Sequence, residues 1–509
     1  MRAAWSLLIM TLSGVAYGLC FPPVAARPLA WVVLVPAFVA LRRAPARRVA
    51  LDAAVLAIVG ACTTVAWLPR TVVVYFQQPL AVGVALFALV TLIMVVPYYV
   101  AFALFYARCG RTRRATLPLL AGAAWVTGEL ARSHLLGGNP WVLFGYTQVG
   151  IDHVTQIADL AGVYGVSFTL AAVNVALAET WIAWRDTGQL RPAAGGLLSA
   201  AAVVACVLAY GHLRLGRGLA SEAAPVPVAI VQGNVDLGAQ WRSDLYGRNL
   251  DLYLRLTIDA LRAQHTELVV WPETAMTFFV ADEPIYRASI ASVLQPFGAE
   301  LLAGGPYAAG ASPARYYNAA FLLAPDGAVR ARYDKRRLLP FAEAVPFEGV
   351  DLIRRNFGRV REFSPGAVGP LLPTVAGAAG VLTCNEAMYP ADARERVRAG
   401  AEILVNLSND TWMDSRQFST IAFDMSALRA VEQHRFLIRA STSGPSAIID
   451  PLGRVTARSG LFTREVLAGT VAPERASTPY TRFGDLFAYA CAAVTFAAGA
   501  AWLIGRRSG

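Results

Sequence analysis

Lysine is almost absent from this sequence. Among 45 lysine and arginine residues in a chain of 509, Lys335 is the only lysine. Arginine is always charged and carries a planar fork of donors, whereas lysine is a compact charge whose pKa can be tuned. A bias toward arginine codons explains the scarcity of lysine but not the exception. We therefore predict a functional role for Lys335.

Cysteine and histidine are also scarce. Between residues 225 and 473 the sequence has one cysteine, Cys384, and two histidines, His265 and His434. A single cysteine forms no disulfide within that segment, and this set lacks the spacing of a metal site. The sequence has no phosphate-binding glycine loop either. We therefore expect neither a metal nor another cofactor.

Charged residues make up only 16% of the chain, and 56% of it is hydrophobic. This composition is too apolar for a purely water-soluble protein. The apolar segments along the chain predict eight membrane-spanning helices, seven of them before residue 213. The predicted spans are 5–20, 29–41, 50–68, 80–107, 116–131, 160–184, 195–212 and 484–504.

The arginines indicate how these spans are oriented. Clusters near residues 2, 42–48, 108–114, 185–191 and 506–507 occupy alternate loops, and basic loops stay in the cytoplasm. Both termini are then cytoplasmic, and the long segment before the last span is extracytoplasmic. The clusters largely explain the net charge of +11, which therefore does not indicate binding to nucleic acid.

The middle of the chain has the patterning of a water-soluble domain. Strand-like and helix-like stretches alternate, and Pro325-Asp326-Gly327 predicts a hairpin. Hairpins exclude a purely parallel sheet, so we expect a layered α/β sandwich with mixed sheets. The predicted domains are a transmembrane bundle at 1–212, a connector at 213–224, the soluble domain at 225–473 and a transmembrane helix at 484–504.

The lone cysteine of this domain follows a short apolar run. Residues 381–383 lead to Cys384, which precedes a polar turn and Pro390. The pattern predicts a buried strand that delivers a thiol to a strand-to-helix corner. A lone cysteine is often only a small buried hydrophobe. A free thiol in an oxidising compartment is an unusual structural choice, however, and favours a chemical role.

Glu273 and Lys335 also lie just after predicted strands. A thiol is a poor nucleophile until a base removes its proton or a cation stabilises the thiolate. A carboxylate and an ammonium supply both functions, and the ammonium can stabilise an oxyanion. A Cys-His pair is the competing arrangement, but both histidines of the domain lie at predicted helix ends.

Three short motifs resemble the nitrilase superfamily of carbon-nitrogen hydrolases. They are Trp-Pro-Glu at Glu273, Tyr-Asp-Lys at Lys335 and Cys-Asn-Glu at Cys384, in this chain order. With membrane spans on both sides, the chain resembles the bacterial apolipoprotein N-acyltransferases, and the resemblance covers essentially its whole length. Further matching stretches are 21–23, 139–148, 162–167, 231–234, 333–346, 407–412, 429–432 and 450–454.

The resemblance implies a fold and a set of roles. The fold is the nitrilase α-β-β-α sandwich joined to an eight-helix membrane domain. Cys384 would be the nucleophile, Glu273 the general base and Lys335 the cation that stabilises the oxyanion. Glu343 matches an additional active-site glutamate of the superfamily.

Other positions match or depart from the family. Trp241 and Glu386 match residues that the family needs for activity, and Trp412 lies in a matching stretch. Asn385 stands where the family usually has tyrosine, so an aromatic surface that could pack on an acyl chain is missing. The stretch 413–417 is shorter than usual and lacks the usual Phe-Gly.

The activity implied is the last step of bacterial lipoprotein maturation at the inner membrane. A membrane phospholipid would acylate the enzyme as a thioester, and the acyl group would then pass to the α-amine of an apolipoprotein's N-terminal diacylglyceryl-cysteine. The catalytic domain would lie on the periplasmic side.

Two alternatives remain open at this point. A membrane-anchored nitrilase-type amidase would use the same three residues with water as acceptor, but has no need of the aromatic segments 137–148 and 278–280. A non-catalytic lipid-binding or lipoprotein-binding homologue is supported by Asn385, whereas the complete set of Glu273, Lys335 and Cys384 argues against it.

Overall fold

The computed structural model describes residues 2–109, 115–218, 223–235, 246–310, 315–344 and 363–505. The chain divides into two compact units. The helical unit comprises Met1–Arg70, Leu80–Gly218 and Arg482–Gly509. The sandwich unit comprises Thr71–Pro79 and Leu219–Thr481, so it takes a short segment from the N-terminal half of the chain.

Helices form the first unit, and several are apolar enough to cross a membrane. Within the described residues four helices meet that standard by length and composition: Leu80–Arg108, Ala158–Thr187, Arg191–Gly216 and Leu486–Ile504. A pair bent by 51°, Arg47–Thr64 and Trp67–Val74, could form a fifth span. The protein is therefore a membrane protein. The main helices are α1 (Arg2–Leu19), α2 (Val35–Arg43), α3 (Ala46–Thr64), α4 (Trp67–Val74), α5 (Leu80–Met94), α6 (Val96–Cys109), α7 (Leu117–His134), α9 (Ala158–Thr187), α10 (Ala194–Gly216) and α18 (Leu486–Gly505).

The segment predicted as a span at 29–41 is not one helix. It forms a short 3-10 helix, Arg27–Trp31, and then the nine-residue α2. Asn174 on α9 stabilises the break: its side chain accepts a hydrogen bond from the backbone of Leu34 at 2.8 Å and donates one to Ala30 at 2.9 Å. The segment is apolar, as predicted. Its helix is interrupted because the Asn174 side chain, 140 residues away along the chain, bonds to the backbone at the break.

Two six-stranded sheets form the sandwich unit. Their strand orders are β12-β1-β2-β3-β4-β5 and β11-β10-β9-β8-β7-β6. Three adjacent strands are parallel in each sheet, β1 to β3 and β7 to β9, and the other pairs are antiparallel. The strands are β1 (Val226–Gln232), β2 (Leu268–Val270), β3 (Glu300–Ala309), β4 (Arg315–Leu323), β5 (Val329–Asp334), β6 (Leu372–Thr374), β7 (Gly377–Thr383), β8 (Ile403–Ser408), β9 (Leu437–Ser441), β10 (Ala447–Ile449), β11 (Val455–Arg458) and β12 (Glu465–Val471).

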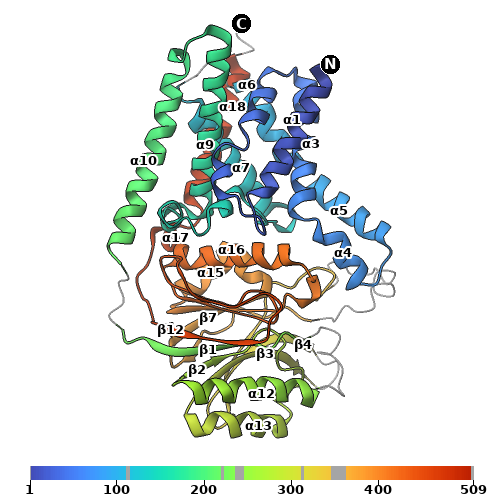
Figure 1. The fold of residues 1–509 in the computed structure, drawn as a ribbon, viewed down its shortest axis with the longest axis vertical. Helices are drawn as coiled ribbons and strands as arrows, with labels where there is room; N and C mark the ends of the chain where they lie inside the picture. Colours follow the sequence, from blue (N-terminus) through green and yellow to red (C-terminus); the bar gives the residue numbers. More distant parts are fainter. Residues whose placement is uncertain are drawn as a thin grey trace. The chain divides into compact units, whose positions relative to one another are not determined.

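Helices cover the outer face of each sheet (Figure 1). α12 (Tyr246–Ala263) and α13 (Pro284–Leu294) lie on the first sheet, and α15 (Pro390–Arg398) and α16 (Arg416–Gln433) on the second. Alternate strand residues fill the space between the sheets, such as Ile230 on β1 and Val405 on β8. The predicted mixed sandwich is confirmed, as an α-β-β-α arrangement. Both faces of each sheet are buried, which explains why the inner strands are continuous apolar runs.

The predicted hairpin is confirmed, and two strands were missed. β4 and β5 pair antiparallel across the predicted turn: Ala319 pairs with Asp334, and Leu323 pairs with Val329. β6 and β11 were not predicted, because β6 has three residues and most of β11 is exposed. Helix α10 continues to Gly216, into the predicted connector.

Candidate active site

Strand ends bring the three predicted reactive residues together. Glu273 lies three residues after β2, Lys335 directly follows β5, and Cys384 directly follows β7. All three side chains are buried, with 5%, 1% and 4% of their residue surface exposed. Cys384 interacts electrostatically with both Glu273 and Lys335. The three groups therefore share one buried site.

Two carboxylates hold the Lys335 ammonium. Its Nζ lies 2.9 and 2.8 Å from the two carboxylate oxygens of Glu343 and 3.3 Å from Oε1 of Glu273. Glu343 also accepts a hydrogen bond from the backbone N–H of Leu339 at 2.8 Å. Because a buried charge requires partners, this arrangement fixes the ammonium in position.

Two asparagines that the sequence did not single out orient the carboxylates. The Asn318 side-chain amide donates to Oε1 of Glu273 at 2.7 Å and to Oε1 of Glu343 at 2.8 Å. The backbone N–H of Asn409 donates to the other oxygen of Glu273 at 2.8 Å. The only hint of this role in the sequence is that Asn318 is a polar residue within the apolar strand β4, and that hint does not say which group it contacts.

Cys384 occupies a strained corner. Its φ is +50°, in the left-handed region, and Thr274 beside Glu273 has φ +57°. Non-glycine residues reach this region at a cost of about 1–3 kcal/mol and do so mainly where the surrounding structure holds them. The predicted strand-to-helix corner is confirmed, since β7 ends at Thr383 and the 3-10 helix Cys384–Met388 follows at once.

Glu386 joins the corner to the loop that carries Lys335. Its carboxylate accepts the backbone N–H groups of Thr383 at 2.7 Å, Arg336 at 2.8 Å and Arg337 at 3.1 Å. It also accepts the Tyr333 hydroxyl at 2.9 Å. One buried carboxylate therefore sets the spacing between the Cys384 turn and the Lys335 loop.

The electrostatics favour a neutral thiol beside a base. Burial raises the pKa of Cys384, and the nearby Glu273 carboxylate raises it further, while Lys335 opposes them. Burial also raises the pKa of Glu273, although Lys335 opposes that shift. Burial alone would lower the pKa of Lys335, but Glu273 and Glu343 raise it well above its usual value. Lys335 is thus a permanent cation, and Cys384 needs a base to react.

The remaining predicted residues differ in how they relate to this site. Asn385 is buried next to Cys384, and its side-chain oxygen has no hydrogen-bond partner in the part of the chain that the structure describes. Trp412 contacts Tyr75 of the Thr71–Pro79 segment, with ring centroids 5.4 Å apart. Trp241 lies outside the described residues.

The histidines do not join the reactive groups. His265 is exposed and lies 3.5 Å from Glu267, and His434 follows the last residue of α16. Within the described ranges, no group of three or more histidine, cysteine, aspartate or glutamate residues is arranged to hold a metal ion.

Comparison with known proteins shows which families and relatives this chain is similar to. Residues 227–480 match the family described as Carbon-nitrogen hydrolase, and residues 13–176 match the Apolipoprotein N-acyltransferase N-terminal domain. The chain is 33% identical over 491 residues to the apolipoprotein N-acyltransferase of Geobacter metallireducens, covering 96% of this chain and 93% of that protein. It is 35% identical over 382 residues to the one from Azotobacter vinelandii, covering 73% and 71%. A solved carbon-nitrogen hydrolase from Helicobacter pylori overlaps 48% of this chain and 88% of its own, at 19% identity and a TM-score of 0.37.

Proposed function

This chain belongs to the apolipoprotein N-acyltransferase family, and we propose that Glu273, Lys335 and Cys384 carry out its reaction in two half-reactions. The enzyme acylates the α-amino group of the N-terminal diacylglyceryl-cysteine of apolipoproteins. The observation that carries the assignment is the Lys335 ammonium, held by Glu343 and Glu273 and coupled electrostatically to Cys384.

The first half-reaction forms a thioester on Cys384. Glu273 removes the proton from the thiol, and the thiolate attacks an ester carbonyl of a membrane phospholipid. A carbon-sulfur bond forms and the ester carbon-oxygen bond breaks. The proton on Glu273 passes to the departing oxygen, so a lysophospholipid leaves. The raised pKa of Glu273, caused mainly by burial, supports this role, because a higher pKa makes the carboxylate a stronger base toward the thiol.

The second half-reaction transfers the acyl group to nitrogen. The free α-amine of the lipid-modified N-terminal cysteine attacks the thioester carbonyl, forming a carbon-nitrogen bond and breaking the carbon-sulfur bond. Glu273 takes the proton lost by nitrogen and returns it to the Cys384 sulfur. The product is an amide, and the enzyme is restored.

Lys335 serves both halves as a fixed positive charge. Each half-reaction passes through a tetrahedral intermediate with a negatively charged oxygen, which a preorganised cation stabilises. Its contacts to Glu343 keep the ammonium in place before the oxyanion forms. Glu343 therefore acts through Lys335, as a positioning residue.

The sidedness follows from the arginine clusters. We assign eight spans, counting the broken segment of the 3-10 helix Arg27–Trp31 and α2 as one of them, with both termini in the cytoplasm and the sandwich unit on the periplasmic side of the inner membrane. Among the residues that the structure describes, four helices and one bent pair are apolar enough to span, and this supports the multi-pass part of the assignment. Both substrates are lipids, so an enzyme anchored in the bilayer meets them without extracting them from it.

The test is to trap the acyl-enzyme. Purified full-length protein is incubated with phospholipid that carries a labelled acyl chain, and a hydroxylamine-sensitive adduct is expected on the Cys384 peptide. Cys384→Ala should form none, whereas Cys491→Ala, which removes another buried thiol, should behave as wild type. A diacylglyceryl peptide with a free amine should discharge the adduct, and the same peptide with a blocked amine should not.

Two outcomes would overturn the proposal. Transfer by Cys384→Ala at the wild-type rate would remove the nucleophile. Release of free fatty acid at the same rate with and without the amine acceptor would identify a hydrolase.

A further inference from the structure

A row of residues crosses the second sheet directly behind the nucleophile. Leu382 on β7 pairs with Asn406 on β8, and Asn406 pairs with Arg439 on β9. Asn406 and Arg439 are completely buried. Their strand neighbours fill the space between the sheets, so both side chains lie on the opposite face, which α16 covers.

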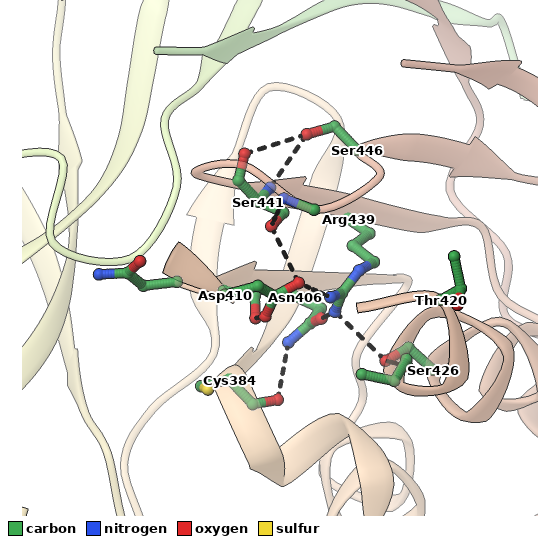
Figure 2. Close-up of polar contacts among 12 residues, drawn as sticks. Cys384, Asn406, Asp410, Thr420, Ser426, Arg439, Ser441 and Ser446 are labelled. Atoms are coloured by element: carbon green, nitrogen blue, oxygen red, sulfur yellow. Dashed lines mark hydrogen bonds and ion pairs between the residues drawn. The ribbon is translucent and has the colours of Figure 1, made fainter. Parts of the chain in front are cut away.

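The Asn406 amide is held at both ends. Its Nδ2 donates to the backbone carbonyl of Leu382 at 2.8 Å and to that of Cys384 at 3.2 Å. Its Oδ1 accepts a hydrogen bond from Arg439. A guanidinium only donates, so the amide oxygen must face Arg439 and the amide nitrogen must face the carbonyls. Figure 2 shows this chain of contacts from Arg439 through Asn406 to Cys384.

Arg439 is fixed in turn by Asp410. Its Nη2 lies 2.8 Å from Oδ2 of Asp410, and neither side chain is exposed. Asp410 also accepts the hydroxyls of Ser408 at 2.7 Å and Ser441 at 3.2 Å. A Cβ at Gly444 would lie 2.1 Å from Oδ2 of Asp410, so the chain around this carboxylate admits no side chain there. The ion pair is enclosed, and its geometry is set from several sides.

Cys384 needs such support. Its φ of +50° is unfavourable for a residue with a side chain, so the turn persists only where contacts hold it. Glu386 holds the Leu382–Thr383 peptide unit, ahead of Cys384 in the chain, through the Thr383 N–H. Asn406 holds the peptide after Cys384 through the Cys384 carbonyl. Because a peptide unit is planar, fixing that carbonyl also fixes the direction of the Asn385 N–H.

We propose that Asn406 is a positioning residue for the nucleophile, kept in the required orientation by the buried Arg439–Asp410 ion pair. The inference rests on the proposed role of Cys384. Asn406 holds the backbone of the nucleophile, and its task is to keep the thiol aligned with Glu273 and Lys335.

The sharpest variant is Asn406→Asp. Aspartate has nearly the same size and still pairs with Arg439, but it offers an oxygen instead of a donor to the carbonyls of Leu382 and Cys384. Loss of alignment should slow acyl-enzyme formation about 10- to 100-fold. The KM for phospholipid should stay unchanged, because Asn406 acts on the Cys384 backbone. Alkylation of Cys384 by iodoacetamide, followed on its own peptide by mass spectrometry, should slow in parallel.

Thr420→Val is the matched control. Thr420 is a buried polar residue of α16, and its hydroxyl donates to Arg416 O at 2.7 Å and Gln417 O at 3.2 Å, within its own helix. This nearly isosteric change should leave acylation and alkylation at the wild-type rate. A purely structural role for Asn406 would lower the yield or Tm of Asn406→Asp but leave the rate per alkylatable Cys384 unchanged, and that result would overturn the proposal.

A measurement on the wild-type protein tests the same point without a variant. Hydrogen exchange of the peptide spanning residues 380–388 should be as slow as that of β8, because the Leu382–Thr383 and Cys384–Asn385 peptide units are both anchored. Exchange at the rate of an exposed loop would overturn the inference even if Asn406→Asp did not fold. If Cys384→Ala is inactive while folded Asn406→Asp acylates normally, only this inference fails. Activity in Cys384→Ala would instead remove the proposed function.

Discussion

The ammonium of Lys335 contacts both carboxylate oxygens of Glu343, at 2.9 and 2.8 Å. Glu273 approaches the same ammonium with one oxygen only, at 3.3 Å. Glu343 is thus the closer partner of the cation, and Glu273 is less tightly engaged. This division suits the proposed role of Glu273 as a base, because Glu343 keeps the charge on Lys335 balanced while Glu273 exchanges protons.

Glu343→Gln should shift the pH dependence toward acid. The negative charge of Glu343 raises the pKa of Glu273, after the larger effect of burial, so its removal makes Glu273 easier to ionise. A reaction that needs the Glu273 carboxylate will then persist to lower pH. The weaker base should also reduce the acylation rate about 10-fold. The measurement is kcat/KM for acyl-enzyme formation against pH.

Glu300→Gln is the control for this shift. Glu300 is a buried glutamate of β3 that pairs with Arg330, and its loss should leave the pH profile unchanged. An acid limb that stays in place or moves upward in Glu343→Gln would contradict the arrangement described.

Asn318→Leu should shift the same limb in the opposite direction. The Asn318 amide donates to Glu273, and this hydrogen bond lowers the pKa of Glu273. Leucine removes the donor at similar volume, so the pKa rises and the carboxylate forms only at higher pH. The two variants are compared in one assay, since a general loss of stability cannot move the limb both ways. A downward shift in Asn318→Leu would count against this account.

Lys335→Arg should inactivate the enzyme although it keeps the charge. Lys335 is 1% exposed and its Nζ is enclosed by two carboxylates, so the larger, planar guanidinium has no room. We expect acylation to fall about 100-fold or more. Arg454→Lys is the reciprocal control, because Arg454 is half exposed and pairs with Asp450. Near-normal turnover of Lys335→Arg would show that a lysine is not required.

Glu386→Gln should weaken both stability and acylation. Glu386 accepts hydrogen bonds from Thr383, Arg336 and Arg337, and glutamine turns a donor toward part of this set. Chemical denaturation should show a loss of about 2 kcal/mol. Tyr333→Phe removes only the hydroxyl contact and should cost about 1 kcal/mol with nearly full activity. Equal losses in the two variants would mean that the backbone contacts contribute nothing.

The sequence predicted the turns and corners of the sandwich, because the residues next to them in the chain determine their conformation. The β4–β5 hairpin follows from Pro325-Asp326-Gly327, and the Cys384 corner follows from an apolar run that ends in a polar turn. The strand order was not predictable in this way. β12 pairs with β1, joining Val226 to Val471, and nothing near either residue encodes that pairing.

In the candidate active site, too, the sequence indicated individual residues but not their contacts with residues far away in the chain. Lys335 was indicated by its rarity and Cys384 by its isolation, and both properties can be read from the sequence. The significance of Asn318 and Asn406 lies in their partners, which are 45 and 22 residues away. A polar residue within an apolar strand signals a buried hydrogen bond but not which group receives it.

The sandwich unit includes the segment Thr71–Pro79, which begins almost 150 residues before the rest of that unit starts at Leu219. Tyr75 contacts Trp412 there, and the Thr71 hydroxyl lies 3.6 Å from Sδ of Met413. A gene fragment that starts at residue 219 therefore does not encode the complete unit. This half of the protein is not a self-contained unit of sequence, because exchanging it between relatives by a single crossover would separate Trp412 from Tyr75, the ring that it contacts.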